Sequence, residues 1–453
     1  MEIERSTYVT IILAALFLIL GTLTAHAQSA SPSATPTPGL CSVDTLPNGA
    51  MPVCATGAES PPSLLGVSGG NYNSVSYVAK TNTITCCTGT LGALVMSSRA
   101  VPMVLSSGHV FARNSSTSKS AALNEAIVQP GLVDLGCWQD PTEQVAKLTS
   151  WSKINFSGGA NTLDAAVATV VNREQTPGGT PTAGIDPEGR IFNLVSSSFP
   201  TGEFPADQIS STPFPYNSLF AGMAVVKMGR TSCLTSGQID AFDAMGKVVY
   251  PGKVCNEVAA GTALFDHQIL VIGAPLVNTG GSACTFAESG DAGALVVTAD
   301  DFLDGFNCPQ AIGIIFAGTP AAGTTYGPEL SSTIVAVNPI ADILSKFNVT
   351  LVGKSCTGGE FGSQASGGDP VLEVSDAKRQ SIEQVRAVKT RNAARLLKMD
   401  EVTAVGIGAG ADSDHAALNV YLSKDTPAVR AKIPTQIDGV MVAIKHAPKF
   451  QAL

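Results

Sequence analysis

The chain has 453 residues, enough for two or three domains with sizeable cores. Charged residues make up only 14% of it and the net charge is −9, which argues against binding to nucleic acid. Gly is abundant, with 45 residues, and Val, Ile and Thr recur in short runs, so the composition favours a mainly β fold with many turns.

The first 27 residues predict a signal peptide. A short polar start leads into the apolar run 9–20, and Ala25-His26-Ala27 fits a small-residue cleavage site. An uncleaved membrane anchor is the alternative, because the apolar run approaches spanning length. The Ser-, Pro- and Thr-rich linker at 28–40 favours cleavage. We therefore expect a secreted or periplasmic protein with no membrane attachment after cleavage.

Ten cysteines follow the signal segment, and an even number in an exported chain favours disulfides. Spacing alone does not give their connectivity. We expect Cys284 to pair with Cys308 and Cys233 with Cys255, because these bridges would brace a loop and close a hairpin. No cysteine spacing matches a zinc site, so we predict no metal and no cofactor.

Residues 41–354 alternate short apolar runs with Gly, Asn, Ser and Asp, which favours a sandwich or barrel over a parallel α/β sheet. A Pro- and Gly-rich stretch at about 173–220 predicts a surface insertion. Near the end of this part, Pro339 suits the first turn of a helix over 338–347.

A Gly- and Ser-rich linker at 355–371 separates this part from a small α+β domain predicted at 372–453. Ser375 is a suitable N-cap for an amphipathic helix over about 375–398. Three strands are expected after it, near 403–408, 416–423 and 440–445.

Three polar positions each adjoin an apolar strand. His109 follows one strand, Asp164 precedes another, and Gly290-Asp291-Ala292-Gly293 comes third. In acyl transfer by serine proteases a histidine takes the proton of the nucleophile and an aspartate orients the histidine ring. A single histidine or aspartate in a β protein is more often structural, but the joint order indicates a peptidase site.

With these residues the chain resembles the trypsin/chymotrypsin-like serine peptidases, and more narrowly their bacterial and plant narrow-leaf-type relatives. The resemblance covers about residues 84–350 and implies a double β-barrel with the site in the cleft between the barrels. The other matching segments are Gly89-Thr90-Leu91-Gly92, Leu105-Ser106-Ser107-Gly108-His109-Val110, Gly229-Arg230-Thr231-Ser232 and Ile312-Gly313-Ile314-Ile315-Phe316-Ala317-Gly318.

The resemblance implies that His109 is the general base, that Asp164 orients it, and that the N–H groups of Gly290 and Ala292 form the oxyanion hole. His109 should therefore lie within hydrogen-bond reach of Asp164 and face Ala292. Phe316–Gly318 should pair with an extended peptide by strand addition. The implied substrate-binding residues are Phe286, Ala287, Phe316, Ala317 and Gly318.

Ala292 stands where the family has its nucleophilic serine, and alanine offers no attacking atom. Ser289 cannot replace it, because the turn presents only one side chain to the cleft. Loss of a serine nucleophile lowers kcat by about 10⁶. The sequence thus predicts an inactive peptidase homologue that binds a peptide or protein in its cleft. The alternatives are a Ser-to-Ala variant of an active endopeptidase and a surface or envelope scaffold protein.

Overall fold

The computed structural model does not describe every residue, and the predicted signal peptide and the linker at 28–40 lie outside the described ones. Of the linker predicted at 355–371, only residue 355 is described. The described residues are 41–43, 54, 56–114, 119–173, 180–194, 206–250, 261–274, 284–299, 309–320, 331–355, 375–412 and 414–453.

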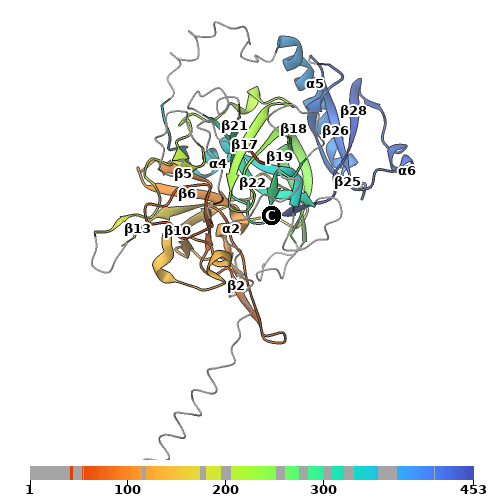
Figure 1. The fold of residues 1–453 in the computed structure, drawn as a ribbon. Helices are drawn as coiled ribbons and strands as arrows, with labels where there is room; N and C mark the ends of the chain where they lie inside the picture. The colour runs from red at the N-terminus through yellow and green to blue at the C-terminus, as the bar shows by residue number, and fades with distance from the viewer. Residues whose placement is uncertain are drawn as a thin grey trace, which may run out of the picture.

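Most described elements are strands, and most strands belong to two large curled sheets (Figure 1). The predicted mainly β fold with two barrel-like sheets and a C-terminal α+β part is therefore confirmed. The first sheet, in spatial order, consists of β24 (Val349–Leu351), β5 (Ala93–Ser97), β6 (Pro102–Ser107), β12 (Ala165–Val170), β10 (Gln144–Trp151), β9 (Ala126–Val128), β1 (Ser68–Asn71) and β4 (Gly89–Thr90).

The second sheet is larger and includes the longest described strand. Its spatial order is β11 (Ala160–Asn161), β19 (Gly261–Gly273), β23 (Ser331–Pro339), β22 (Ala311–Pro320), β21 (Leu295–Thr298), β17 (Ala224–Gly229), β18 (Cys233–Tyr250), β25 (Val402–Ala409), β26 (Ala416–Leu422), β28 (Val440–His446) and β27 (Gln436–Ile437). Two short strands also join it: β20 (Ala287–Glu288) beside β23, and β29 (Phe450–Ala452) beside β18 and β22.

Continuous apolar runs become the central strands of this second sheet. Ile269 lies opposite Val337 and Ile272 opposite Ile334, so β19 and β23 pair along their β-branched segments. Such residues fit a pleated surface that is covered on both faces. Register shifts along the β18–β19 pair mark bulges, which bend the long strands and curl the sheet.

The remaining elements are short strand pairs and helices. The pairs are β2 (Val75–Val78) with β3 (Thr83–Cys86), β7 (Arg113–Asn114) with β8 (Lys119–Ser120), β13 (Asn172–Arg173) with β14 (Thr182–Ala183) and β15 (Ile191–Phe192) with β16 (Ala206–Asp207). The helices are α2 (Gly108–Phe111), η1 (Leu132–Leu135), η2 (Pro141–Glu143), η3 (Tyr216–Ser218), α4 (Ile340–Phe347), α5 (Asp376–Leu396) and α6 (Pro427–Arg430).

Helix α5 forms where the sequence predicts it. The Ser375 hydroxyl accepts a hydrogen bond from the Lys378 N–H, so the predicted N-cap is confirmed. Its buried face includes Ile382, Val385 and Val388, and it packs on β25 and β26. Helix α4 differs in detail, because Pro339 is its N-cap and not a residue of its first turn.

The C-terminal part does not form a sheet of its own. Strand β25 pairs antiparallel with β18, with Ala241 opposite Gly408 and Phe242 opposite Ile407, so one sheet runs from the second barrel into residues 402–446. One apolar cluster also includes side chains from both sides of this junction, such as Phe242 and Ile407. The blue strands of Figure 1 therefore extend the green ones.

Three disulfides join distant segments within the described residues: Cys41–Cys284, Cys54–Cys233 and Cys86–Cys137. The predicted pairings of Cys284 and Cys233 are wrong; the other cysteines of those predictions, Cys255 and Cys308, lie outside the described residues. The reason is tertiary. The segment at 41–43 lies beside β18, and the Cys41 N–H donates to the Thr285 carbonyl oxygen at 2.9 Å.

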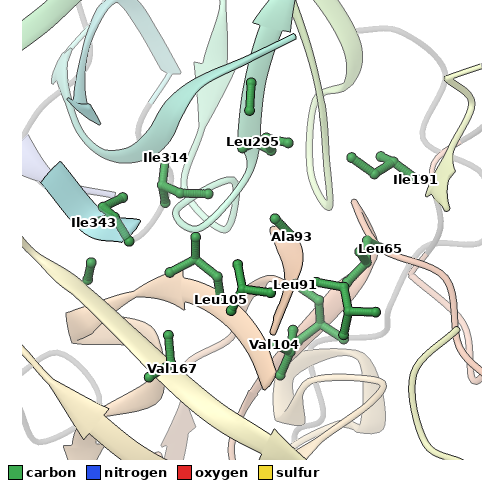
Figure 2. Close-up of a cluster of buried hydrophobic side chains, with 14 of the residues drawn as sticks. Leu65, Leu91, Ala93, Val104, Leu105, Val167, Ile191, Leu295, Ile314 and Ile343 are labelled. Carbon is green, nitrogen blue, oxygen red and sulfur yellow. The ribbon is translucent and has the colours of Figure 1, made fainter. Parts of the chain in front are cut away.

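A continuous apolar core joins the two sheets. Figure 2 shows Leu105 and Val167 of the first sheet in one cluster with Leu295 and Ile314 of the second, and all four are buried. Because protein interiors are close-packed, loops at this junction are held in defined positions. Within the described residues, no helix is long and apolar enough to cross a membrane.

Candidate active site

His109 and Asp164 meet because of the register between β6 and β12. These strands are antiparallel, with Ser107 opposite Ala165. The end of β6, which leads into His109, therefore lies beside the start of β12, which Asp164 precedes. The His109 Nδ1 atom is 2.7 Å from Asp164 Oδ2, and its backbone N–H donates to Asp164 Oδ1 at 2.9 Å.

Two residues of the second sheet complete the surroundings of Asp164, which is fully buried. The Tyr250 hydroxyl donates to Asp164 Oδ2 at 2.8 Å. The Asn338 side chain accepts from the Asp164 N–H at 3.1 Å and donates to its carbonyl oxygen at 2.9 Å. A buried carboxylate needs such partners. Sequence analysis missed both residues, because each is distant in sequence and has no motif.

Gly108 allows the backbone to approach the carboxylate. A Cβ atom at this position would lie 2.5 Å from Asp164 Oδ1, closer than real Cβ atoms come. The glycine before His109 therefore has a steric role that its place in the sequence motif does not reveal.

Asp291 is held by a cation inside the protein. Neither the Lys227 nor the Asp291 side chain is exposed, and Lys227 Nζ lies 3.3 Å from Asp291 Oδ2. Asp291 also accepts hydrogen bonds from the Ser232 hydroxyl and from the N–H groups of Thr231 and Glu288. These bonds tie the loop at 288–293 to the segment after β17.

The ion pair changes the titration of both groups. Burial raises the pKa of Asp291, but the Lys227 charge and the hydrogen bonds from Ser232, Glu288 and Thr231 lower it by more, so its pKa lies below the usual value. Burial lowers the pKa of Lys227, and the Asp291 charge opposes this shift only in part. Lys227 was also missed, although a lysine inside the apolar run 224–229 is itself a signal of a buried partner.

The first sheet clamps the same loop. The Thr90 N–H donates to the Ala292 carbonyl oxygen at 2.8 Å, and the Thr90 hydroxyl donates to the Gly290 carbonyl oxygen at 2.9 Å. A Cβ atom on Gly92 would lie 2.2 Å from the Gly293 oxygen. The motif Gly89-Thr90-Leu91-Gly92 thus allows β4 and the start of β5 to pack closely against the loop at 288–293.

The loop conformation depends on two glycines with positive φ values. Gly290 and Gly293 have φ values of +101° and +97°, a region that L-residues rarely adopt. Among the described residues, no hydrogen bond uses the N–H of Gly290 or of Ala292. Ala292 is fully buried, and its carbonyl oxygen lies beside Val110 in the space around Gly89.

The strand predicted to line the substrate groove is β22. Phe316, Ala317 and Gly318 are central in it and buried. On one side β22 pairs with β23, and on the other it pairs with β21 and, further along, with β29. The Leu453 N–H donates to the Phe316 carbonyl oxygen at 3.2 Å, so Leu453 lies beside β22.

The predicted specificity region is buried beside this strand. Phe286 and Ala287 are fully buried, and Leu453 packs against the cluster that contains them. The Phe286 N–H donates to the Ser332 carbonyl oxygen. The Ser332 hydroxyl is buried and has no hydrogen-bond partner among the described residues. It lies beside Gly318, since a Cβ atom there would be 2.2 Å from it.

No family model matches the sequence, and no curated protein matches it. Among solved structures, the chain is similar to a Nocardiopsis protease, at 12% identity over 58% of this chain and 93% of that one, with a TM-score of 0.32. It is similar to a Cellulomonas bogoriensis chymotrypsin, at 14% identity over 64% and 98%, with a TM-score of 0.33. A glutamic acid-specific serine protease matches at 14% identity over 64% and 100%, with a TM-score of 0.35. At these TM-scores the likeness is too slight to assign a site or an activity to this chain.

Proposed function

We propose that the chain is an exported homologue of trypsin-like serine peptidases that binds an extended peptide in its inter-barrel cleft without hydrolysing it. The observation that carries the proposal is the methyl group of Ala292 on a loop whose surroundings are otherwise complete. His109 and Asp164 are hydrogen-bonded, and the loop is fixed by a buried ion pair.

The chemistry explains why such a site binds without turnover. His109 can exchange a proton and Asp164 holds its ring, while the free N–H groups of Gly290 and Ala292 can bind the oxygen of a peptide carbonyl. None of these groups can form a bond to the carbonyl carbon. Binding and polarisation alone leave a rate that is about 10³–10⁴ times the rate of the reaction in water.

The groove is suited to a peptide backbone. The Phe316 carbonyl oxygen accepts a hydrogen bond from the N–H of Leu453, in the extended C-terminal segment of this chain. The same segment pairs antiparallel with β22 at Ala317 and Gly318. Strand addition of this kind recognises main-chain groups, and side-chain pockets add specificity. The Leu453 side chain packs against the apolar cluster that contains Phe286 and Ala287, which favours an apolar residue at this point of the ligand.

Export is the other part of the proposal. Disulfides persist in oxidising compartments, and three of them join segments between 51 and 243 residues apart. They support the secreted or periplasmic location that the N-terminal sequence predicts.

The experiment restores the missing oxygen. We expect the Ala292→Ser variant to be labelled by a leucine-containing peptidyl phosphonate, whereas the parent chain is not, with mass spectrometry as the readout. Because Leu453 lies against His109, each protein is tested at full length and in a form that ends at Ala452.

Two controls locate the labelled atom. Adding His109→Ala to Ala292→Ser should abolish labelling, because the base is gone. Adding Ser289→Ala should leave labelling unchanged, because that hydroxyl is outside the site. Folded Ala292→Ser proteins of both lengths that remain unlabelled would contradict the proposal and favour a scaffold role.

A further inference from the structure

We infer that residues 450–453 are a tethered ligand of the cleft. They occupy it in the resting protein and exclude other peptides. The inference rests on the proposed function, because it concerns the same groove. In Figure 1 the end of the chain, marked C, lies near α2 and β22, away from the blue strands that precede it.

The backbone of this segment binds as an added strand. β29 is antiparallel to β22, with Ala452 opposite Ala317 and Gln451 opposite Gly318. This is the pairing predicted for a peptide ligand at the groove strand. On its other side β29 runs parallel to β18. The segment therefore fills the space between two strands of the second sheet.

Leu453 reaches the candidate catalytic pair. Its carbonyl oxygen lies 2.9 Å from His109 Nε2, while the other ring nitrogen faces Asp164. The Leu453 side chain lies beside Gly318, because a Cβ atom on Gly318 would be 3.3 Å from its Cδ1 atom. Leu453 thus lies between β22 and the ring nitrogen of His109 that does not face Asp164.

Phe450 anchors the segment. Its side chain is 1% exposed and belongs to an apolar cluster with Phe265, Phe316 and Val248. Gln451 and Ala452 are also buried, whereas Leu453 is only partly buried. Leu453 can therefore move away from His109 while Phe450 stays in place.

The segment indicates which ligand would compete with it. Such a peptide is extended, places leucine beside His109, has a small residue before the leucine, and carries an aromatic residue three positions before it. A short tether provides an effective concentration in the millimolar range, so a free peptide must bind strongly or be abundant to displace the tip.

The first measurement tests whether the tip covers His109. Diethyl pyrocarbonate acylates accessible imidazole nitrogens, and peptide mass spectrometry gives the rate at each histidine. We expect His109 to react at least about tenfold faster in the chain that ends at Ala452, because it loses both a hydrogen bond and cover. His415, with 69% of its side chain exposed, is the internal reference. Leu453→Ala is the matched control, since it keeps the carbonyl group and should keep His109 protected.

The second measurement uses acetyl-Phe-Gln-Ala-Leu as the probe in calorimetric titrations of a second shortened chain, which ends at Lys449, because Phe450, Gln451 and Ala452 would otherwise still occupy the edge of β22. We expect binding to this shortened chain and none to the full chain. If His109 becomes exposed but the peptide does not bind, the result would support the inference that the chain's own end covers His109. It would count against the proposed function. Equal protection of His109 in both folded chains, or equal peptide binding by both, overturns the inference. Phe450→Ala, which keeps the tip but weakens its anchor, is the second variant if the shortened chain does not fold.

Discussion

Lys227 and Asp291 have no solvent-exposed side-chain surface, yet each carries a charge. Such a pair costs much desolvation energy, so it is weak support for stability by itself. Its role here is to hold the loop before Ala292. The Lys227 ammonium group donates to Asp291 Oδ2 at 3.3 Å from the neighbouring strand β17.

Replacing Lys227 tests how strongly the loop depends on it. Lys227→Met should lower the free energy of unfolding by about 3–5 kcal/mol, because it leaves a buried carboxylate without its counter-charge. Chemical denaturation measures the change. The double variant Lys227→Met/Asp291→Asn should recover part of the loss, and a single variant as stable as the parent would contradict the role of the ion pair.

The same carboxylate predicts a pH dependence. The pKa of Asp291 in the folded protein is below its unfolded value of about 3.9. Its contribution to stability is therefore complete above the unfolded value and is lost as the pH falls through the folded pKa. Urea denaturation between neutral and acid pH should show this loss. In Asp291→Asn the acid-dependent loss should be smaller; an unchanged profile would rule Asp291 out as its source.

At the scale of elements, the loop at 288–293 depends on close packing against the first sheet. Gly293 has a φ value of +97°, and a Cβ atom there would lie 2.1 Å from the Ser106 hydroxyl oxygen and 2.3 Å from the Thr90 carbonyl oxygen. The loop therefore requires glycine for two reasons, the backbone conformation and the lack of space.

Gly222 allows the effect of backbone conformation to be measured separately from the effect of crowding. Its φ value is +96°, but nothing lies within 4 Å of a Cβ atom there. Both Gly293→Ala and Gly222→Ala should lose about 1–2 kcal/mol of unfolding free energy from backbone strain. Gly293→Ala should lose about 1–3 kcal/mol more from overpacking. Thermal or chemical denaturation compares the two variants, and equal losses would show that the loop tolerates the extra atom.

At the scale of the whole molecule, α5 holds the C-terminal part on the second sheet through a buried lysine. Lys389 Nζ lies 2.9 Å from Asp243 Oδ1 and 2.8 Å from Asp266 Oδ1. The Lys389 side chain is 5% exposed, while the Asp266 side chain is 34% exposed. Two acidic residues of the second sheet thus meet one cation of α5.

Two positions of α5 make a matched comparison. Lys389→Met should lower the free energy of unfolding by about 2–3 kcal/mol, less than for a fully buried pair because Asp266 is partly exposed. Arg391 pairs with Asp438 at the surface, so Arg391→Met should change the free energy of unfolding by less than about 0.5 kcal/mol. Denaturation followed by circular dichroism measures both, and equal effects would mean that the buried contact does not hold α5 in place.

The sequence was most informative where a signal is local. The Ser375 cap and the apolar spacing of α5 depend on neighbouring residues, so they were predicted correctly. The order of His109, Asp164 and Ala292 predicted three positions for the candidate site, and two of them, His109 and Asp164, lie within hydrogen-bond distance. The disulfide pairings were wrong, because Cys41 and Cys284 are 243 residues apart and no local pattern links them.

By itself, then, the sequence determined the mainly β class, the helix and strands of the C-terminal part and the absence of an oxygen at Ala292, because propensity, periodicity and residue identity are properties of short segments. The tertiary structure alone decided that Tyr250 and Asn338 hold Asp164, that Lys227 neutralises Asp291 and that Leu453 reaches His109. These contacts join residues that only the pairing of distant strands brings together, and strand register is a property of the whole sheet.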